Sequence, residues 1–173
     1  MNITPGIRTV ADFYTESQPY ITLFNTFITK HALMGQAAVD HINYKCDSAE
    51  TFEHIRALFE YDSEYIYQSI ISNRRIALIK LRRSIPTGLG PIALLELSDQ
   101  KPDHSQTNKF EHIEAYPLAK TYEDFLQLFA TTETLIPHAR VHHSTQDIDM
   151  GNGFLFRCTT GPLIEKIKTG EMV

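Results

Sequence analysis

Two histidines in this chain stand in the same short motif, once in each half. The motif is an acidic residue, a histidine and an isoleucine, found as Asp40-His41-Ile42 and as Glu111-His112-Ile113. Each copy opens a stretch that alternates like a β-strand and is followed by a helix with a capping signal. A repeat of this kind indicates two related structural units that carry their imidazoles at equivalent positions. Imidazole is the commonest metal ligand in proteins, so the pair predicts a metal site. The alternative for each histidine alone is a half-buried ring bonded to a backbone carbonyl.

The third ligand that the sequence offers is Glu96. It interrupts an otherwise apolar strand-like run, Ile92-Ala93-Leu94-Leu95-Glu96-Leu97, where an ionised carboxylate is costly to bury without a partner. Two imidazoles and one carboxylate on one side of a divalent ion leave positions open for water or substrate. This arrangement is expected for Fe(II) and is compatible with Mn, Ni, Co or Zn. We therefore predict a metal site at His41, Glu96 and His112. The alternative for Glu96 is an ion pair with Lys80 or Arg157.

Two further charged residues are predicted to face this site as catalytic groups. Glu114 follows His112 by two positions and shares its face of the strand, where it can act as a general base or an alternative ligand. Arg157 lies in the strand-like run Phe154-Leu155-Phe156-Arg157-Cys158, at the place that Glu96 takes in the first half. Its fork of N–H donors suits the carboxylate or phosphate of a substrate.

The first half of the chain shows the elements that must position these residues. Residues 8–33 have helical periodicity, and Pro19 is expected to divide them into two helices. A β-α-β-β-β order follows: a strand at 40–46, a helix capped by Asp47, and strands at 65–72, 76–81 and 91–97. We assign residues 1–36 to N-terminal helices and residues 37–100 to a first βαβββ module.

The pattern restarts after a polar linker at residues 99–108. A strand at 110–116, a helix capped by Thr121, strands at 140–144 and 153–159 and a short helix at 162–168 form a second module, 109–173. This module is one strand shorter than the first. The fold class is α+β: a single domain, 1–173, in which the paired modules form a curved mixed sheet around a cleft, with the N-terminal helices outside. Strand alternation directs Ile42, Tyr44 and Cys46 to the helices and the two histidines to the cleft.

Composition narrows the classes of protein. The 173 residues are 42% hydrophobic and 21% charged, which is typical of a globular protein. A net charge of -5 disfavours nucleic acid as a partner. Cys46 and Cys158 form no CxxC pair, which fits a reducing compartment. No signal peptide and no apolar run of roughly 20 residues is seen, so we expect a cytoplasmic protein without a membrane partner.

The motifs resemble those of a known family. Asp40-His41-Ile42-Asn43-Tyr44-Lys45-Cys46, Phe110-Glu111-His112-Ile113-Glu114 and Leu95-Glu96-Leu97 are similar to segments of the YecM family of bacterial proteins. Paired βαβββ modules with ligands on their first and last strands resemble the vicinal oxygen chelate superfamily, which includes glyoxalase I, extradiol dioxygenases and bleomycin-resistance proteins. The resemblance implies a metal site at His41, Glu96 and His112, with the metal acting as a Lewis acid on substrate oxygens. It implies no single reaction. Arg157 departs from the four-ligand pattern of glyoxalase I, which favours dioxygenase-like or isomerase-like chemistry.

The function that we expect is that of a metal-dependent enzyme, of isomerase, dioxygenase or lyase type, acting on a small oxygenated acid. Two alternatives stay open on the same fold: a non-catalytic protein that binds or sequesters a small molecule, and a metal-free structural domain. The expected partner is a small molecule, and the chain is expected to be a monomer or a homodimer.

Overall fold

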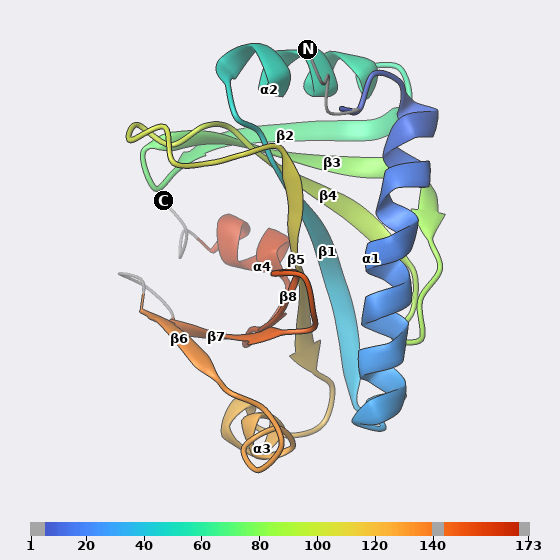
Figure 1. Cartoon of the computed structure of the whole chain (residues 1–173), viewed down its shortest axis with the longest axis vertical. Helices are drawn as coiled ribbons and strands as arrows, with labels where there is room; N and C mark the ends of the chain where they lie inside the picture. Colours follow the sequence, from blue (N-terminus) through green and yellow to red (C-terminus); the bar gives the residue numbers. More distant parts are fainter. Residues whose placement is uncertain (1–5, 140–143, 170–173) are drawn as a thin grey trace.

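An eight-stranded mixed sheet, strongly curved, organises the molecule (Figure 1). The structure is a computed structural model that describes residues 6–139 and 144–169. The strand order is β2-β3-β4-β1-β5-β8-β7-β6. The first unit contains β1 (Ala37–Lys45), α2 (Ala49–Leu58), β2 (Ser63–Ile71), β3 (Arg74–Ile85) and β4 (Ile92–Ser98). The second contains β5 (Lys109–Pro117), α3 (Tyr122–Gln127), β6 (Ile136–Ala139), β7 (Ser144–Asp149) and β8 (Leu155–Cys158).

The two units have the same internal topology. In each, the first strand pairs in parallel with the last, β1 with β4 and β5 with β8. The two first strands then pair with each other in antiparallel fashion and join the halves into one sheet. This symmetry places β1 and β5 side by side at the centre of the sheet, which confirms the predicted α+β class and the curved mixed sheet.

The prediction that the second unit lacks a strand is wrong. Three strands, β6, β7 and β8, follow α3. The missed strand, β6, has four residues, lies at the edge of the sheet and contains Pro137, so it shows neither the length nor the alternation that marks a strand. The predicted strand at 140–144 falls mostly on residues 140–143, which lie outside the described residues; Ser144 begins β7.

One long helix precedes the sheet, where two were predicted. Helix α1 (Val10–Lys30) runs through Pro19 without a break. A proline inside a helix costs about 3 kcal/mol relative to alanine. Burial of a single large apolar side chain returns about 1.5–3 kcal/mol, and α1 buries several of them: Phe13, Tyr14, Ile21, Phe24, Phe27 and Ile28. Tertiary packing therefore outweighs the local penalty of Pro19.

Helices cover the convex side of the sheet, and the core lies between them and the strands. The ring of Phe13 in α1 lies 5.2 Å from that of Phe59 at the end of α2, and Phe27 lies 5.8 Å from Phe129 just after α3. The predicted core residues Ile42 and Tyr44 are buried on this side. A local correction concerns α2, whose N-cap is Ser48 rather than Asp47, since the Ser48 hydroxyl accepts the N–H of Thr51.

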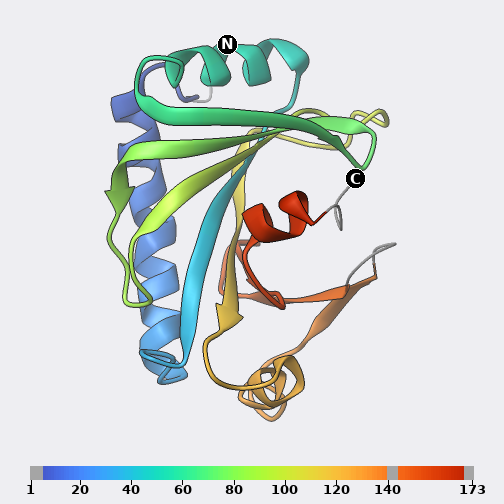
Figure 2. The same ribbon diagram turned by 180° about the vertical axis from the view of Figure 1, so that it is seen from behind.

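A last helix, α4 (Leu163–Lys168), lies on the concave side, within the curve of the sheet (Figure 2). Its first N–H, from Leu163, donates to Oδ2 of Asp40 on β1 at 3.0 Å. The sequence predicted this helix but not its position. Among the described residues, no helix is both long enough and apolar enough to pass through a lipid bilayer.

Candidate metal centre

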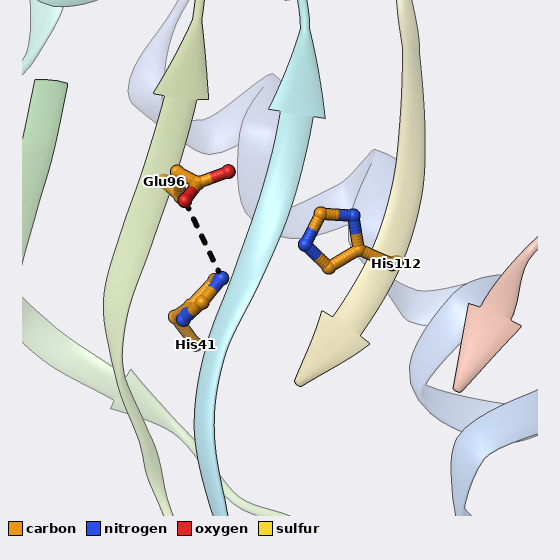
Figure 3. Close-up of side chains that lie close together, drawn as sticks. All are labelled: His41, Glu96 and His112. Carbon is orange, nitrogen blue, oxygen red and sulfur yellow. Dashed lines mark ion pairs between the residues drawn. The ribbon is translucent and has the colours of Figure 1, made fainter. Parts of the chain in front are cut away.

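His41, Glu96 and His112 come together on the concave side of the sheet (Figure 3). They arise from β1, β4 and β5, which are neighbours in the order β4-β1-β5. One ligand atom from each lies within 4.8 Å of the others, and the two imidazole centroids are 5.6 Å apart. The two units thus bring their matching histidines to one place, as the repeat predicted.

Strand register explains why these three side chains meet. Asn43 of β1 pairs with Glu96 of β4, so their side chains lie on the same face of the sheet. His41 is two residues before Asn43 and therefore lies on that face too, which is the concave one. On the other side, His41 pairs with Glu114 of β5, and the register shifts on either side of this pair. The Nε2 atom of His41 is 3.7 Å from a carboxylate oxygen of Glu96 and 3.7 Å from one of Glu114.

The ring of His41 is held by a carboxylate on one nitrogen and left without a partner on the other. Nδ1 donates to Oδ2 of Asp40 at 2.7 Å. Nε2 is buried and has no hydrogen-bond partner in the described part of the chain. A buried, unpaired nitrogen that faces carboxylates and a second imidazole is the environment of a metal ligand, because the metal would satisfy that nitrogen. These residues therefore fit a divalent ion of the kind that the sequence implied.

The second histidine also has the preceding acidic residue beside its Nδ1 atom. Nδ1 of His112 contacts Oε2 of Glu111 at 3.2 Å, and the other oxygen of Glu111 accepts from Lys45. In both motifs the acidic residue before the histidine thus orients the ring, a role that carboxylates commonly have behind metal-bound histidines. In the sequence this acid is part of the repeated motif, but no function was predicted for it. Its repetition next to each histidine could have indicated the orienting role.

Charge distribution differs sharply between the two imidazoles. Burial alone would lower the pKa of His41, but the carboxylates of Glu114, Asp40 and Glu96 raise it to about 9. Burial and the cation of Arg157 lower the pKa of His112 to about 4. Without a metal ion, His41 is therefore an imidazolium balanced by carboxylates, and His112 is neutral. A divalent cation can replace the proton of His41, because the carboxylates that balance the positive charge are already in place.

Glu114 lies where the sequence placed it, on the face shared with His112. Its side chain is buried, and burial raises the pKa of its carboxyl group. Glu114 also belongs to a second group of potential ligands, with Asp40 and His41, whose atoms lie within 4.8 Å of one another. Within this second group, Asp40 already accepts from the ring of His41 and from the backbone of α4.

Arg157 faces the same cavity but is engaged by a partner that the sequence analysis missed. Its Nε and Nη2 atoms each donate to the carboxylate of Asp147 at 2.8 Å, and both residues are buried. Its Nη1 atom lies 3.3 and 3.2 Å from the two ring nitrogens of His112, a position beside the ring rather than along either lone pair. Asp147 was missed because the predicted strand ended at residue 144, whereas β7 continues to Asp149, so its pairing with Arg157 was not foreseen. Glu96 accepts from Asn43 at 2.6 Å, a partner that was not predicted either.

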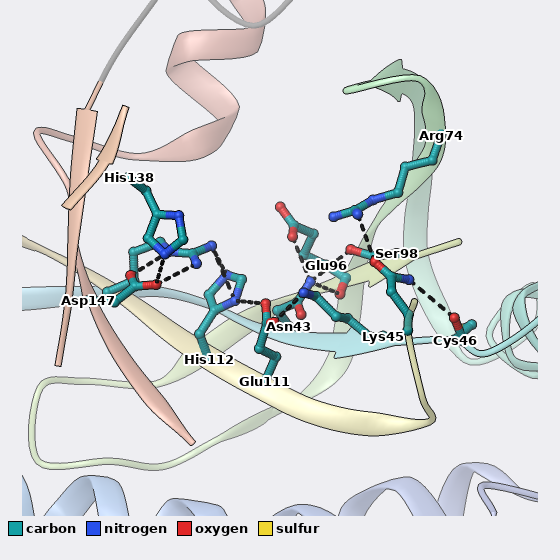
Figure 4. A network of polar contacts seen from close by, with 12 residues as sticks. Asn43, Lys45, Cys46, Arg74, Glu96, Ser98, Glu111, His112, His138 and Asp147 are labelled. Carbon is teal, nitrogen blue, oxygen red and sulfur yellow. Dashed lines mark hydrogen bonds and ion pairs between the residues drawn. The ribbon is translucent and has the colours of Figure 1, made fainter. Parts of the chain in front are cut away.

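These groups line a cavity of about 410 Å³ between β-strands and α4. Figure 4 shows the polar network along it, from His138 and Asp147 through His112 and Glu111 to Asn43 and Glu96. The cavity wall carries five basic residues, Lys45, Arg74, Lys101, Arg157 and Lys166, and four acidic ones, Glu96, Glu111, Glu114 and Asp147. A space of this size suits a small metabolite.

The curved sheet of two βαβββ units, with histidine and glutamate side chains on its concave face, is the arrangement that the motifs predicted. The chain belongs to the YecM family, whose model, described as YecM protein, matches residues 11–150. Among curated proteins, no sequence matches the chain.

Solved structures agree with this fold. A structural-genomics protein, EC4020, superposes with a TM-score of 0.70 at 18% identity, over 92% of this chain and 92% of that chain. Methylmalonyl-CoA epimerase in complex with methylmalonyl-CoA and NH4+ superposes with a TM-score of 0.50 at 17% identity, over 75% of this chain and 98% of the epimerase. A variant of the Streptomyces coelicolor epimerase, in complex with 2-nitronate-propionyl-CoA, gives the same values. At these identities the similarity shows the fold alone.

Proposed function

We propose that this protein is a divalent-metal-dependent enzyme of the vicinal oxygen chelate type that acts on a small oxygenated acid. The observation that carries the proposal is the buried Nε2 atom of His41, which faces two carboxylates and a second imidazole and has no hydrogen-bond partner in the described chain. His41, Glu96 and His112 would hold the ion. When bound, the ion would polarise substrate oxygens as a Lewis acid.

The remaining groups of the site have roles that follow from their positions. Glu114 is buried beside His41 and lines the cavity, and burial raises the pKa of its carboxyl group, which favours its taking up and returning a proton. Arg157 is held by Asp147 with its Nη1 beside His112, so it presents a fixed positive charge to the bound substrate. Charge that develops on substrate oxygens would be stabilised there without further rearrangement.

Metal content is the direct test. Protein purified without an affinity tag should contain about one equivalent of Fe, Mn, Ni, Co or Zn, or take it up after dialysis. His41→Ala and His112→Ala should lose the metal and keep the fold by circular dichroism. His54→Ala is the matched control, since His54 is exposed on α2, and it should retain the metal. No uptake of any of these metals by the unmodified protein would refute the proposal.

A catalytic protein is separated from a binding protein by turnover. Metal-loaded protein is incubated with a panel of 2-oxo, 2-hydroxy and malonyl-type acids under air and under nitrogen. Product that disappears in the Glu114→Gln variant, while metal content stays unchanged, supports the enzyme. Binding without product after long incubation supports a sequestering protein.

A further inference from the structure

One buried cation in the cavity has no carboxylate partner among the described residues. Lys166 of α4 is 6% exposed and lines the same cavity as His112 and Glu114. Its Nζ donates to the hydroxyl of Thr159, which is a neutral partner. The other buried cation of the wall, Arg157, has Asp147 as its carboxylate partner. An ammonium group has three N–H donors, and a buried charge is costly unless it is paired. Lys166 can therefore donate further hydrogen bonds to an anionic ligand.

An unpaired hydroxyl group accompanies this cation. Oγ1 of Thr145 on β7 is buried and has no hydrogen-bond partner in the described chain, and Thr145 also lines the cavity. Strands β7 and β8 are antiparallel, with Asp147 opposite Arg157 and Gln146 opposite Cys158. Continuing that register by one residue places Thr145 beside Thr159, the residue that Lys166 contacts. Because side chains alternate along a strand, Thr145 and Asp147 share the face that looks into the cavity.

We propose that Lys166 and Thr145 form an oxyanion subsite that takes the carboxylate or phosphate group of a ligand. The subsite suits an anion, because among the described residues its ammonium has no carboxylate within ion-pair distance and its hydroxyl has no hydrogen-bond partner, and both side chains are buried. It lies next to the Asp147–Arg157 pair, whose Nη1 contacts His112. One part of this inference rests on the proposed function. While the anionic group of the ligand occupies the subsite, the other oxygens of the ligand would reach the metal site beyond Arg157. The substrate class narrows to acids with an anionic group close to a chelating pair of oxygens.

The test uses metal-free full-length protein, so that its outcome is independent of metal binding. The probes are malonate and inorganic phosphate, titrated by calorimetry at low ionic strength, with malonamide as the uncharged comparison. Unmodified protein should bind malonate or phosphate and not malonamide. Malonate alone identifies a carboxylate subsite, and phosphate alone identifies a phosphate subsite.

Two variants separate binding from folding. Lys166→Met, which keeps the apolar stem, should weaken binding by about tenfold or more, the size of one charged hydrogen bond. Thr145→Val should weaken it by about threefold to tenfold while leaving the melting temperature equal or higher, because the lost hydroxyl has no partner to leave behind. The control is Lys168→Met, since Lys168 is exposed on the same helix and pairs with Glu165.

Equal affinity in Lys166→Met and the unmodified protein, or no binding of either anion by the unmodified protein at tens of millimolar, would overturn the proposal. Failure of the metal site alone would leave these anion titrations unchanged, so the two ideas fail separately. A metal-binding protein that ignores both anions keeps the proposed function and loses this subsite.

Discussion

Metal binding should release about one proton at neutral pH, and the proton should come from His41. The pKa of the His41 imidazole is raised to about 9, against an ordinary value near 6.5, although burial opposes the shift. At pH 7.5 about 97% of a group with that pKa is protonated, compared with about 10% of an ordinary histidine. Since only a neutral imidazole can bind a metal, the ion must displace this proton. His112, with a pKa lowered to about 4, is already neutral and contributes none.

The displaced proton should also make the affinity for the metal ion depend on pH. With one proton displaced, the apparent association constant should rise about tenfold per pH unit, hence about 100-fold between pH 6 and 8, and level off above pH 9. An ordinary histidine would level off near pH 7. Because the charge of Glu114 makes the largest single contribution that raises the pKa of His41, Glu114→Gln should release less than one proton at pH 7.5 and shift the plateau to lower pH.

Calorimetry provides the assay. Zinc or manganese is titrated at pH 7.5 in two buffers of different ionisation enthalpy, and the difference in observed heat gives the number of protons released. Affinities at pH 6, 7 and 8 follow from competition with a chelator. Release of less than about 0.3 proton with binding intact would refute the reasoning, since His41 would then not be an imidazolium in the metal-free protein.

Three further changes test the structure around the site. Pro19→Ala should raise the free energy of unfolding by about 1 kcal/mol or more in urea denaturation, because Pro19 is exposed within α1 and its loss restores a helix hydrogen bond; a lower stability would contradict the unbroken helix. Asp147→Ala should lower the free energy of unfolding by about 3–5 kcal/mol, because it leaves the buried Arg157 unpaired, and Asp147→Ala combined with Arg157→Met should recover most of the loss. If the double variant is as unstable as the single one, the cost lies elsewhere. Glu111→Gln should weaken metal affinity by about tenfold in chelator competition, because it loosens the ring of His112; unchanged affinity would deny Glu111 that orienting role.

The convergence of His41, His112 and Glu96 could be predicted because it depends on properties that a sequence carries directly. A repeated motif locates two equivalent strands, strand alternation assigns a face to each residue, and a lone carboxylate in an apolar strand marks a site. The same reasoning placed Glu114 on the face of the strand that carries His112. Metal binding itself stays a prediction, which the arrangement of the three side chains supports.

What escaped prediction depended on long-range packing. Whether Pro19 breaks a helix is decided by the aromatic contacts of α1 with distant elements, not by local propensity. The four-residue edge strand β6 owes its existence to pairing with β7 rather than to its own composition. The Asp147–Arg157 pair could not be predicted without the register of β7 and β8. The position of α4 depends on its hydrogen bond to Asp40, which is distant in sequence.

The course of α1 across both units bears on how a ligand enters. The helix runs along the convex side of the sheet (Figure 1). Its Phe13 packs on Phe59 of the first unit, and its Phe27 packs on Phe129 of the second. Parting the halves like a hinge would expose these rings to water, at about 1.5–3 kcal/mol for each large side chain. We therefore expect the halves to stay together during ligand exchange, with passage beside α4, which is held by the hydrogen bonds from Leu163 to Asp40 and from Lys166 to Thr159.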